Sequence, residues 1–351
     1  MTNDFNTIKV LLFTGLAFIF TMAWTPLFTH FLYKYKLGKN IRNSGETPIF
    51  SKLHLHKAGT PTMGGILIWM TVLIFSLSIY YLADLFPNSI FVSLNFLSRE
   101  QTLLPLGALV ATALVGLFDD WLDIRGSGVK GGGGLNMKHR FAIYAVIALI
   151  GALWFYFKLD WDLFHIPFVG LVKLGWSYIL IFILVIVATA HSVNLTDGLD
   201  GLAGGALLTS FAAYAVIAFS MGKYDLAVFC GVIVGALLGF LWFNIMPARF
   251  YMGDTGAMSL GVTLGVIAML TNTALILPVI GLIFVIESLS VIIQLTSKKL
   301  RNGKKVFLSS PIHHHFEAKG WIEAKIVMRF WVISGVAATI GLVLFLSDKT
   351  M

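Results

Sequence analysis

The sequence predicts an all-α polytopic membrane protein, a single domain over residues 1–351 with about ten transmembrane helices. Of its 351 residues, 58% are hydrophobic and only 12% are charged, and the mean hydropathy is +0.86. Soluble globular proteins carry roughly 25% charged residues, so about half of the usual charge is missing. The apolar residues also form separate stretches of membrane-spanning length, and the basic residues fall mainly on one side of them.

Ten apolar stretches approach the length of roughly 20 residues that a helix needs to cross the hydrocarbon layer. The segments between them are too short to form a soluble domain. The lone cysteine, Cys230, lies within one stretch and cannot form an internal disulfide, so we expect it to be lipid-facing or packed. The predicted spans are residues 10–32, 63–85, 102–118, 140–157, 173–190, 201–220, 226–245, 256–271, 274–296 and 327–346.

The lysines and arginines predict the orientation of these spans. Most of the 25 basic residues lie in segments that follow odd-numbered spans. Because basic loops stay in the cytoplasm, we expect odd-numbered spans to end there and both termini to lie on the non-cytoplasmic side. The net charge of +8 therefore reflects membrane topology and predicts no nucleic-acid partner. The basic residues on the other side are Lys9, Arg99, Lys158, Lys173, Lys223 and Lys349.

Aspartates gather on the predicted cytoplasmic side, at the ends of three hairpins. Acids that can hold a divalent cation, surrounded by basic residues, suit a site for phosphorylated, metal-bound substrates. A transporter of phosphorylated lipids is a rival interpretation, but transporters place ionisable groups near the bilayer centre and show internal repeats. The aspartates are Asp119, Asp120, Asp123, Asp197, Asp200 and Asp254.

The stretch from Asn194 to Ala203 is the most polar interruption of the apolar sequence. It contains an amide, a hydroxyl, two carboxylates and two glycines. Asp197 and Asp200 are three residues apart, so on a helix they would share a face and could bind one cation or one phosphate. The alternative is a polar loop with a helix cap, although one cap needs only one acid.

Two other acidic segments also favour a metal or phosphate site. The adjacent carboxylates of Asp119 and Asp120 repel each other, and bound Mg²⁺ would relieve this repulsion; a solvated helix end is the alternative. Asp254 follows Gly253 at a predicted helix start, where it would either cap the helix or bind a metal. Asn244, at the end of the preceding span, would likewise cap or contact a ligand.

Histidines and bases complete the candidate site. Three consecutive histidines within PIHHHFE point in different directions, so they form a surface loop or act separately, by donating hydrogen bonds or transferring a proton beside a diphosphate. Lys138 and Arg140 enter the fourth span, either as phosphate ligands or as ordinary juxtamembrane bases. Glu287 and Gln294 share a face of the ninth span, and Glu287 should face the bundle or a cavity.

The whole chain resembles the bacterial phospho-N-acetylmuramoyl-pentapeptide-transferase family, within the larger group of polyprenyl-phosphate hexosamine-1-phosphate transferases. The motifs that carry the resemblance are collinear: residues 57–65, Asp119-Asp120, Asn194 to Ala203, Gly253-Asp254 and the histidine run. PIHHHFE is the most specific of them, because it resembles this branch and not the relatives that transfer N-acetylglucosamine 1-phosphate. Those relatives are the nearest alternative.

The resemblance implies an enzyme of the bacterial inner membrane that works on the cytoplasmic face with Mg²⁺. Phospho-MurNAc-pentapeptide would pass from UDP-MurNAc-pentapeptide to undecaprenyl phosphate, giving UMP and the first lipid-linked peptidoglycan precursor. The family is a ten-span homodimer embedded in membrane lipids, with its ninth helix broken over a lipid-facing groove. Phosphoryl transfer in a single displacement is our expectation, and a covalent aspartyl-phosphate on Asp119 is the alternative.

The resemblance also implies roles for individual residues. Asp254 and Asp197 would hold Mg²⁺, and Asp119 would keep the lipid phosphate ionised, with Asp120 and His313 as further candidate catalytic residues. Other positions match substrate contacts in the family: Lys57, Thr62, Lys138, Asn194, Asp197, Asp200, Asn244, Tyr251, Gln294, His313, His314 and His315.

The chain departs from the family pattern in three places. His191 stands where the family usually has an asparagine, Gly204-Gly205 replaces a bulkier continuation of the motif, and residues 131–134 are all glycine. None of these departures removes a carboxylate.

Overall fold

Nine helices in the described part of the chain are long and apolar enough to cross a membrane. The computed structural model describes residues 3–38, 57, 59–99, 101–126 and 134–349. These helices confirm the prediction of a polytopic all-α membrane protein and coincide with nine of the ten predicted spans. They are α1 (Asn3–Lys34), α3 (Ile66–Leu85), α5 (Leu103–Arg125), α6 (Met137–Lys158), α7 (Ser177–Thr196), α8 (Leu202–Ser220), α9 (Tyr224–Asn244), α10 (Gly253–Leu270) and α14 (Glu323–Lys349).

The predicted span 274–296 is not one continuous helix. It is divided into α11 (Leu277–Ile280) and α12 (Leu282–Leu300), with Gly281 between them at φ −93° and ψ 34°. α12 carries Glu287 and two lysines in its last turn, and the buried part of its surface is largely polar. Hydropathy alone therefore gave the wrong element here, because one apolar stretch spans two helices, whereas the broken ninth helix implied by the resemblance is present.

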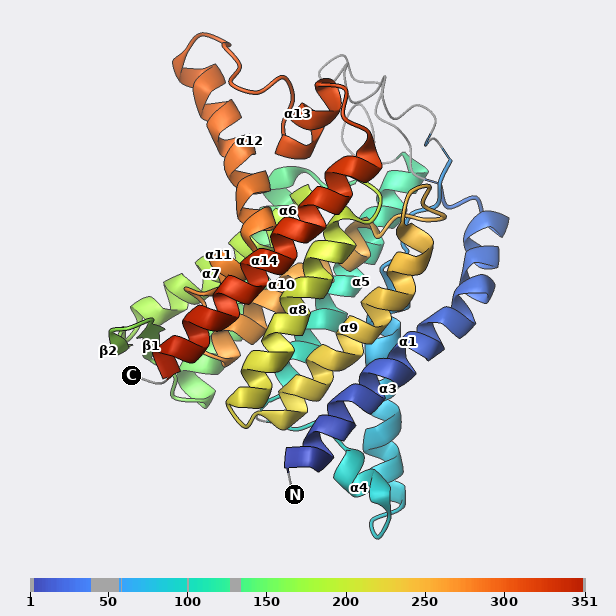
Figure 1. The fold of residues 1–351 in the computed structure, drawn as a ribbon, viewed down its shortest axis with the longest axis vertical. Helices are drawn as coiled ribbons and strands as arrows, with labels where there is room; N and C mark the ends of the chain where they lie inside the picture. Colours follow the sequence, from blue (N-terminus) through green and yellow to red (C-terminus); the bar gives the residue numbers. More distant parts are fainter. Residues whose placement is uncertain (1–2, 39–56, 58, 100, 127–133, 350–351) are drawn as a thin grey trace.

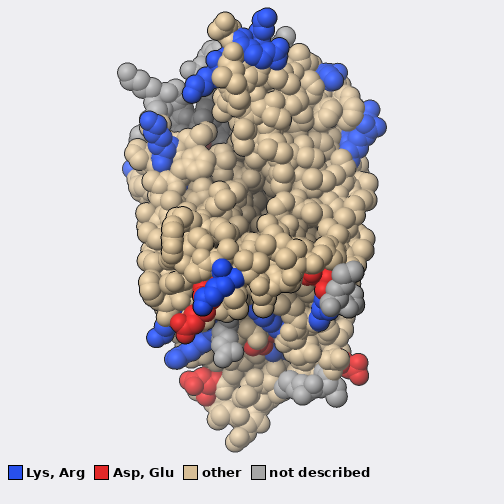
Figure 2. Space-filling model, turned by 90° about the vertical axis from the view of Figure 1, so that its left-hand side faces the viewer, with Lys and Arg blue, Asp and Glu red and all other residues tan. Residues whose placement is uncertain are grey.

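The two ends of the bundle differ in what they carry. Both termini lie at one end, and the short helix α13 (Ile312–Ala318) lies at the other, which we call the site end (Figure 1). On the face shown in Figure 2, charged side chains gather near both ends, with a belt of uncharged residues between them. This distribution suits a protein that crosses a bilayer, because charges are costly within the hydrocarbon layer.

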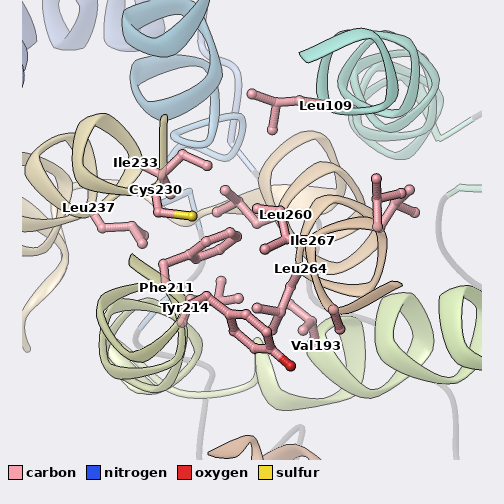
Figure 3. Packing of buried hydrophobic residues seen from close by; sticks show 14 of the residues in the cluster. Leu109, Val193, Phe211, Tyr214, Cys230, Ile233, Leu237, Leu260, Leu264 and Ile267 are labelled. Carbon is pink, nitrogen blue, oxygen red and sulfur yellow. The ribbon is translucent and has the colours of Figure 1, made fainter. Parts of the chain in front are cut away.

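α10 forms the centre of the bundle. Nearly all of its residues are buried, and it packs mainly against α5 and α7. Figure 3 shows Leu260, Leu264 and Ile267 of α10 surrounded by apolar side chains of the neighbouring helices. Cys230 is fully buried in this core, so it is packed and not lipid-facing. Because α10 is enclosed on all sides, its first turn at the site end has a well-defined position.

The end of the bundle that holds the termini also carries a β-hairpin that the sequence analysis did not predict. Strands β1 (Leu163–Ile166) and β2 (Gly170–Lys173) pair antiparallel, with Leu163 opposite Lys173. His165 contacts Asp348 of α14 at 2.5 Å, and this contact ties the hairpin to the last helix. Such four-residue strands are easily missed because β2 runs straight into an apolar stretch. A short helix, α4 (Ile90–Leu94), lies between α3 and α5.

Candidate active site

Arg140 brings together carboxylates from two helices at the site end. Its Nε lies 2.8 Å from Oδ2 of Asp119 near the end of α5. Its Nη1 and Nη2 donate to the two oxygens of Asp254, in the first turn of α10, at 3.1 and 2.9 Å. Asn194, in the last turn of α7, donates to Oδ1 of Asp254 at 2.5 Å. We call Asp119, Arg140, Asn194 and Asp254 the acid–arginine cluster.

The acid–arginine cluster is strongly shielded from solvent. The side chain of Asp119 is fully buried, and those of Arg140 and Asp254 are 18% and 13% exposed. The backbone N–H of Leu135 also donates to Oδ1 of Asp119 at 2.5 Å. Two neighbouring carboxylates would repel each other here, so the guanidinium between them supplies the charge compensation that burial requires.

Asp120 has a different task from its neighbour Asp119, because it caps α10. Its two carboxylate oxygens accept hydrogen bonds of 3.0 Å from the backbone N–H groups of Asp254 and Thr255. Thr62 donates to the same carboxylate at 3.3 Å. An acid at a helix N-terminus satisfies unpaired N–H groups and favours the helix dipole. Asp254 therefore does not have to cap its own helix, and its carboxylate is available to Arg140 and Asn194.

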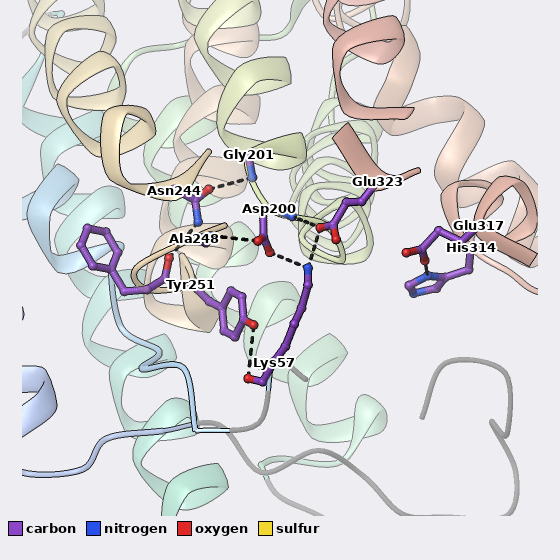
Figure 4. A network of polar contacts seen from close by, with 10 residues as sticks. Lys57, Asp200, Gly201, Asn244, Ala248, Tyr251, His314, Glu317 and Glu323 are labelled. Atoms are coloured by element: carbon purple, nitrogen blue, oxygen red, sulfur yellow. Dashed lines mark hydrogen bonds and ion pairs between the residues drawn. The ribbon is translucent and has the colours of Figure 1, made fainter. Parts of the chain in front are cut away.

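A second group, which we call the lysine cluster, consists of Lys57, Asp200, Asn244, Tyr251 and Glu323 (Figure 4). Nζ of Lys57 lies 2.7 Å from Asp200 and 2.5 Å from Glu323, at the start of α14. The carboxylate of Glu323 also accepts from the backbone N–H of Asp200 at 2.7 Å. Asn244 accepts from the N–H of Gly201 at 3.0 Å, and the Tyr251 hydroxyl lies 3.5 Å from the Lys57 carbonyl.

The lysine cluster ties four segments together around one cation. Burial by itself lowers the pKa of Lys57, but the carboxylates of Glu323 and Asp200 outweigh it and hold that pKa above its ordinary value. Burial also raises the pKa of Tyr251. Lys57 is therefore a charged group throughout the physiological range, positioned beside the turn between α7 and α8.

The three histidines of α13 make separate contacts, as the sequence predicts. His313 is fully buried and its Nδ1 lies 2.9 Å from Glu287 of α12, which is also fully buried. Its Nε2 has no hydrogen-bond partner among the described residues. That ring edge lies against Gly198, where an added Cβ would come within 2.3 Å of Nε2. His313 therefore contacts the polar turn that follows α7.

The other two histidines, His314 and His315, contact residues close to them in the sequence. Nδ1 of His314 lies 2.6 Å from Glu317. Nδ1 of His315 accepts a hydrogen bond of 3.1 Å from the backbone N–H of Leu308. Gln294 holds the same neighbouring segment, because its amide accepts from two backbone N–H groups and donates to the carbonyl of Phe307 at 2.9 Å.

The structure brings most of the predicted site residues to one end of the bundle but gives them unequal positions. Asp197 is half-buried at the first position after α7. Lys138 is exposed and forms no hydrogen bond or ion pair within the described residues, whereas Arg140, two positions on, enters the site. Residues 127–133, which include most of the glycine run, lie outside the described part of the chain.

Sequence reasoning did not assign Glu323 to the site. It begins the last span after an ordinary juxtamembrane segment, so no local signal sets it apart from other acids at helix starts. Glu287 carried a signal, because an acid inside an apolar stretch calls for a buried partner. His313 is that partner.

An apolar groove lies beside the site, between α7 and the break that separates α11 from α12. Its volume is about 170 Å³, and Leu184, Ala188, Ser192, Gly281 and Phe284 are among the residues that line it. At its edge Ser288 of α12 donates to Ser192 at 2.7 Å. The broken helix thus borders a small apolar depression near the end of α7.

Comparisons with known proteins place this arrangement in a family. The family model for glycosyl transferase family 4 matches residues 102–272. A signature of phospho-N-acetylmuramoyl-pentapeptide-transferase matches residues 57–68, the segment that contains Lys57 and Thr62. A phospho-N-acetylmuramoyl-pentapeptide-transferase of Chloroflexus aggregans is 40% identical, covering 96% of this chain and 90% of the relative. The chain belongs to the phospho-N-acetylmuramoyl-pentapeptide-transferase family.

Two further relatives with the same name agree over nearly their full length. That of Anoxybacillus flavithermus is 41% identical over 95% of this chain and 97% of its own. That of Listeria monocytogenes is 38% identical over 93% and 95%. As a member of the phospho-N-acetylmuramoyl-pentapeptide-transferase family, the chain is an enzyme that transfers a phosphorylated group. Family membership therefore favours a transferase over the transporter of phosphorylated lipids considered as the rival interpretation.

Proposed function

We propose that this enzyme transfers phospho-MurNAc-pentapeptide from UDP-MurNAc-pentapeptide to undecaprenyl phosphate and releases UMP. The observation that carries the proposal is the acid–arginine cluster, where Asp119 and Asp254 from two helices meet at one end of a membrane bundle. The apolar groove suits part of a polyprenyl chain, and the lysine cluster offers polar groups to a nucleotide. We place the reaction on the cytoplasmic face of the bacterial inner membrane, in agreement with the excess of basic residues at the site end.

The acid–arginine cluster has a donor set that fits Mg²⁺. Carboxylate and amide oxygens are the ligands this ion prefers, and it commonly takes one or two carboxylates and completes its shell with water and phosphate oxygens. Oδ2 of Asp119 lies 2.8 Å from Nε of Arg140 but accepts no hydrogen bond in the described part of the chain, so a cation that displaces the guanidinium could take its place there. No three His, Cys, Asp or Glu side chains among the described residues form a complete site. We propose Asp254 as the main Mg²⁺ ligand, with Asp119 and Asn194 as its neighbours in the cluster. Asp197, three residues after Asn194 in the sequence, is a further candidate ligand.

The residues of the site divide the work. Asp254, with Asp119 and Asn194, would hold Mg²⁺, which when bound would supply stabilisation of the negative charge on the UMP leaving group. Arg140, which holds both carboxylates in this structure, is placed to turn toward a phosphate once those carboxylates have another cation. Asp119 keeps the lipid phosphate ionised. An oxygen of that phosphate attacks the β-phosphorus of the UDP substrate while the bond from this phosphorus to UMP breaks. The alternative, transient phosphorylation of Asp119, predicts a trapped phosphoenzyme when lipid is withheld.

Release of UMP by the purified protein tests the proposal. Undecaprenyl phosphate and Mg²⁺ would be supplied with UDP-MurNAc-pentapeptide or UDP-N-acetylglucosamine in separate reactions. We expect UMP from the muramoyl substrate only, and its loss in Asp254→Asn. Asp84→Asn, which changes an exposed acid at the end of α3, is the matched control and should keep full activity. UMP from N-acetylglucosamine would instead assign the chain to the sister activity.

Two further measurements address the membrane and the oligomer. Single cysteines replace Lys138 at the site end or Val169 at the hairpin, both exposed, while the native Cys230 is buried. An impermeant maleimide should label Val169→Cys in spheroplasts and Lys138→Cys only after lysis; the reverse pattern would invert the proposed orientation.

The homodimer implied by the family resemblance predicts twice the chain mass of 38.6 kDa in light scattering after detergent subtraction.

A further inference from the structure

A second apolar cavity lies far from the site, between α5 and α6 in the half of the bundle that holds the termini. Its volume is about 270 Å³, and α7 and α10 form its floor. Half of the lining residues that come from α5 and α6 are glycine or alanine, and these leave open space between the two helices. The wall residues include Gly107, Ala108, Ala111, Ala148, Gly151 and Trp154.

Gly107 of α5 lines this cavity and borders open space. Small residues in membrane helices normally let a neighbouring helix approach closely. An added Cβ at Gly107 would instead meet no atom within 4 Å. By contrast, a Cβ at Gly151 on α6 would lie 3.1 Å from Phe182. The α5 side of the cavity is therefore open to an apolar molecule and not filled by protein.

A cation marks the mouth of this cavity. Arg99 lies among the lining residues and is exposed. It forms no hydrogen bond, ion pair or ring contact with any other described residue; its neighbour in the sequence, Glu100, lies outside them. Most other basic residues at this end have acceptors, such as Lys173 with Asp162 at 3.2 Å and Lys9 with the carbonyl of Asn95 at 2.8 Å. Among the described residues Arg99 thus has no acceptor, and it lies beside an apolar cavity at the end where basic residues are scarce.

We propose that this cavity binds one anionic phospholipid of the leaflet opposite the active site, with its phosphate on Arg99 and an acyl chain between α5 and α6. A guanidinium matches the geometry of a phosphate, and basic pockets between membrane helices bind anionic headgroups. The acyl chain enters the cavity from the bilayer, since the cavity opens between two spanning helices. The cavity is distinct from the groove at α11 and α12, because the two share no lining residue. It is also distant from the acid–arginine cluster, since Gly107 precedes Asp119 by twelve positions, roughly 18 Å along α5 at about 1.5 Å per residue.

The occupied cavity has a structural consequence for the enzyme. α5 carries Asp119 and Asp120, and α6 begins with the segment that carries Arg140. A lipid chain between these helices fills space that no side chain fills. It therefore sets the spacing of the two helices whose other ends meet in the acid–arginine cluster.

Photolabelling of the full-length protein tests the proposal. The probes are phosphatidylglycerol and phosphatidylcholine with the same diazirine-bearing acyl chain, added to delipidated protein in detergent. We expect phosphatidylglycerol to label peptides around residues 103–111 and 147–154 at least fivefold more than phosphatidylcholine. Gly107→Leu, whose Cβ would meet no atom within 4 Å, places a side chain at the cavity wall and should abolish that labelling. Arg99→Gln should lower the phosphatidylglycerol signal to the phosphatidylcholine level.

Gly15→Leu is the matched control, because Gly15 is another exposed glycine on a spanning helix with nothing within 4 Å of an added Cβ. It should label like the unchanged protein. Equal labelling in Gly107→Leu would overturn the acyl-chain site, and equal labelling by both lipids would overturn the role of Arg99. Crosslinks between two protein copies at residues 103–111 in place of lipid labelling would show that a second chain covers the cavity. Because labelling does not depend on UMP release, this result is independent of the proposed reaction.

Discussion

The carboxylate of Asp120 accepts a hydrogen bond of 3.0 Å from the backbone N–H of Asp254, and this contact joins the end of α5 to the start of α10. It separates two neighbouring acids by function. Asp120 stabilises a helix start that belongs to another part of the chain, whereas Asp119 faces Arg140. One adjacent pair of aspartates thus supplies both the support of the site and one of its charged groups.

Replacing Asp120 by asparagine should damage stability and activity together. The amide NH₂ would face one of two backbone N–H donors, and leaving a buried donor unpaired costs about 1–3 kcal/mol. We expect a lower midpoint of thermal unfolding in detergent and slower UMP release, because Asp254 loses its fixed position. Asp84→Asn, at an exposed acid, should change neither quantity. An Asp120→Asn enzyme with the original midpoint would show that the cap is not needed.

Replacing Arg140 by glutamine should separate metal binding from catalysis. Without the guanidinium, Asp119 and Asp254 lose the cation that pairs with both of them and that a metal would have to displace. Mg²⁺ should therefore bind several-fold more tightly in calorimetric titration, while UMP release falls on the order of 100-fold, the scale of losing one charge-stabilising donor. Lys138→Gln, two residues away and exposed, is the control and should have a small effect. Weaker Mg²⁺ binding in Arg140→Gln would contradict competition between the guanidinium and the metal.

Replacing Lys57 by methionine should destabilise the lysine cluster. It leaves Asp200 and Glu323 as an uncompensated buried pair, for which the usual cost is about 3–5 kcal/mol. The double variant that also carries Glu323→Gln should recover part of that loss in thermal unfolding. Additive effects of the two substitutions would mean that Lys57 and Glu323 do not interact energetically.

The lysine cluster also predicts a pH dependence of stability. The pKa of Lys57 is raised in the folded protein, so its contribution to stability is fully present below the unfolded pKa of about 10.4 and is lost as the pH rises through the higher folded value. The unchanged protein should therefore lose more stability than Lys57→Met on the alkaline side of that range. Parallel curves for the two proteins would argue against the raised pKa.

Gly205 makes room for a tryptophan of α14. A Cβ at Gly205 would lie 1.9 Å from Nε1 of Trp331, which donates to the carbonyl of Gly201 at 3.0 Å. Gly205→Ala should force this ring away and cost about 1–3 kcal/mol, as overpacking usually does. Trp331→Phe in the same chain should restore part of the loss. Gly15→Ala is the control, and an equal response of Gly205 and Gly15 would show that the contact tolerates a methyl group.

Most of the fold was predictable, because twenty apolar residues in a row have few alternatives to a membrane span. The exceptions are instructive. The interval 274–296 reads as one span because hydropathy averages over Gly281 and does not register a break in the backbone. The β-hairpin at residues 163–173 was not predicted. The side chains that hold it in place, Asp348 and Asn272, come from remote parts of the chain.

The sequence by itself determined that the acids, amides and histidines lie at one end of a membrane bundle, because their distance from the ends of apolar stretches places them there. Only the tertiary structure decided which of them meet. Arg140, and not Lys138, pairs with the carboxylates of the acid–arginine cluster. Asp120 caps α10, and Glu323 pairs with Lys57. The reason is physical: a hydropathy pattern sets the depth of a residue, whereas helix rotation and the crossing of distant helices set the direction of its side chain.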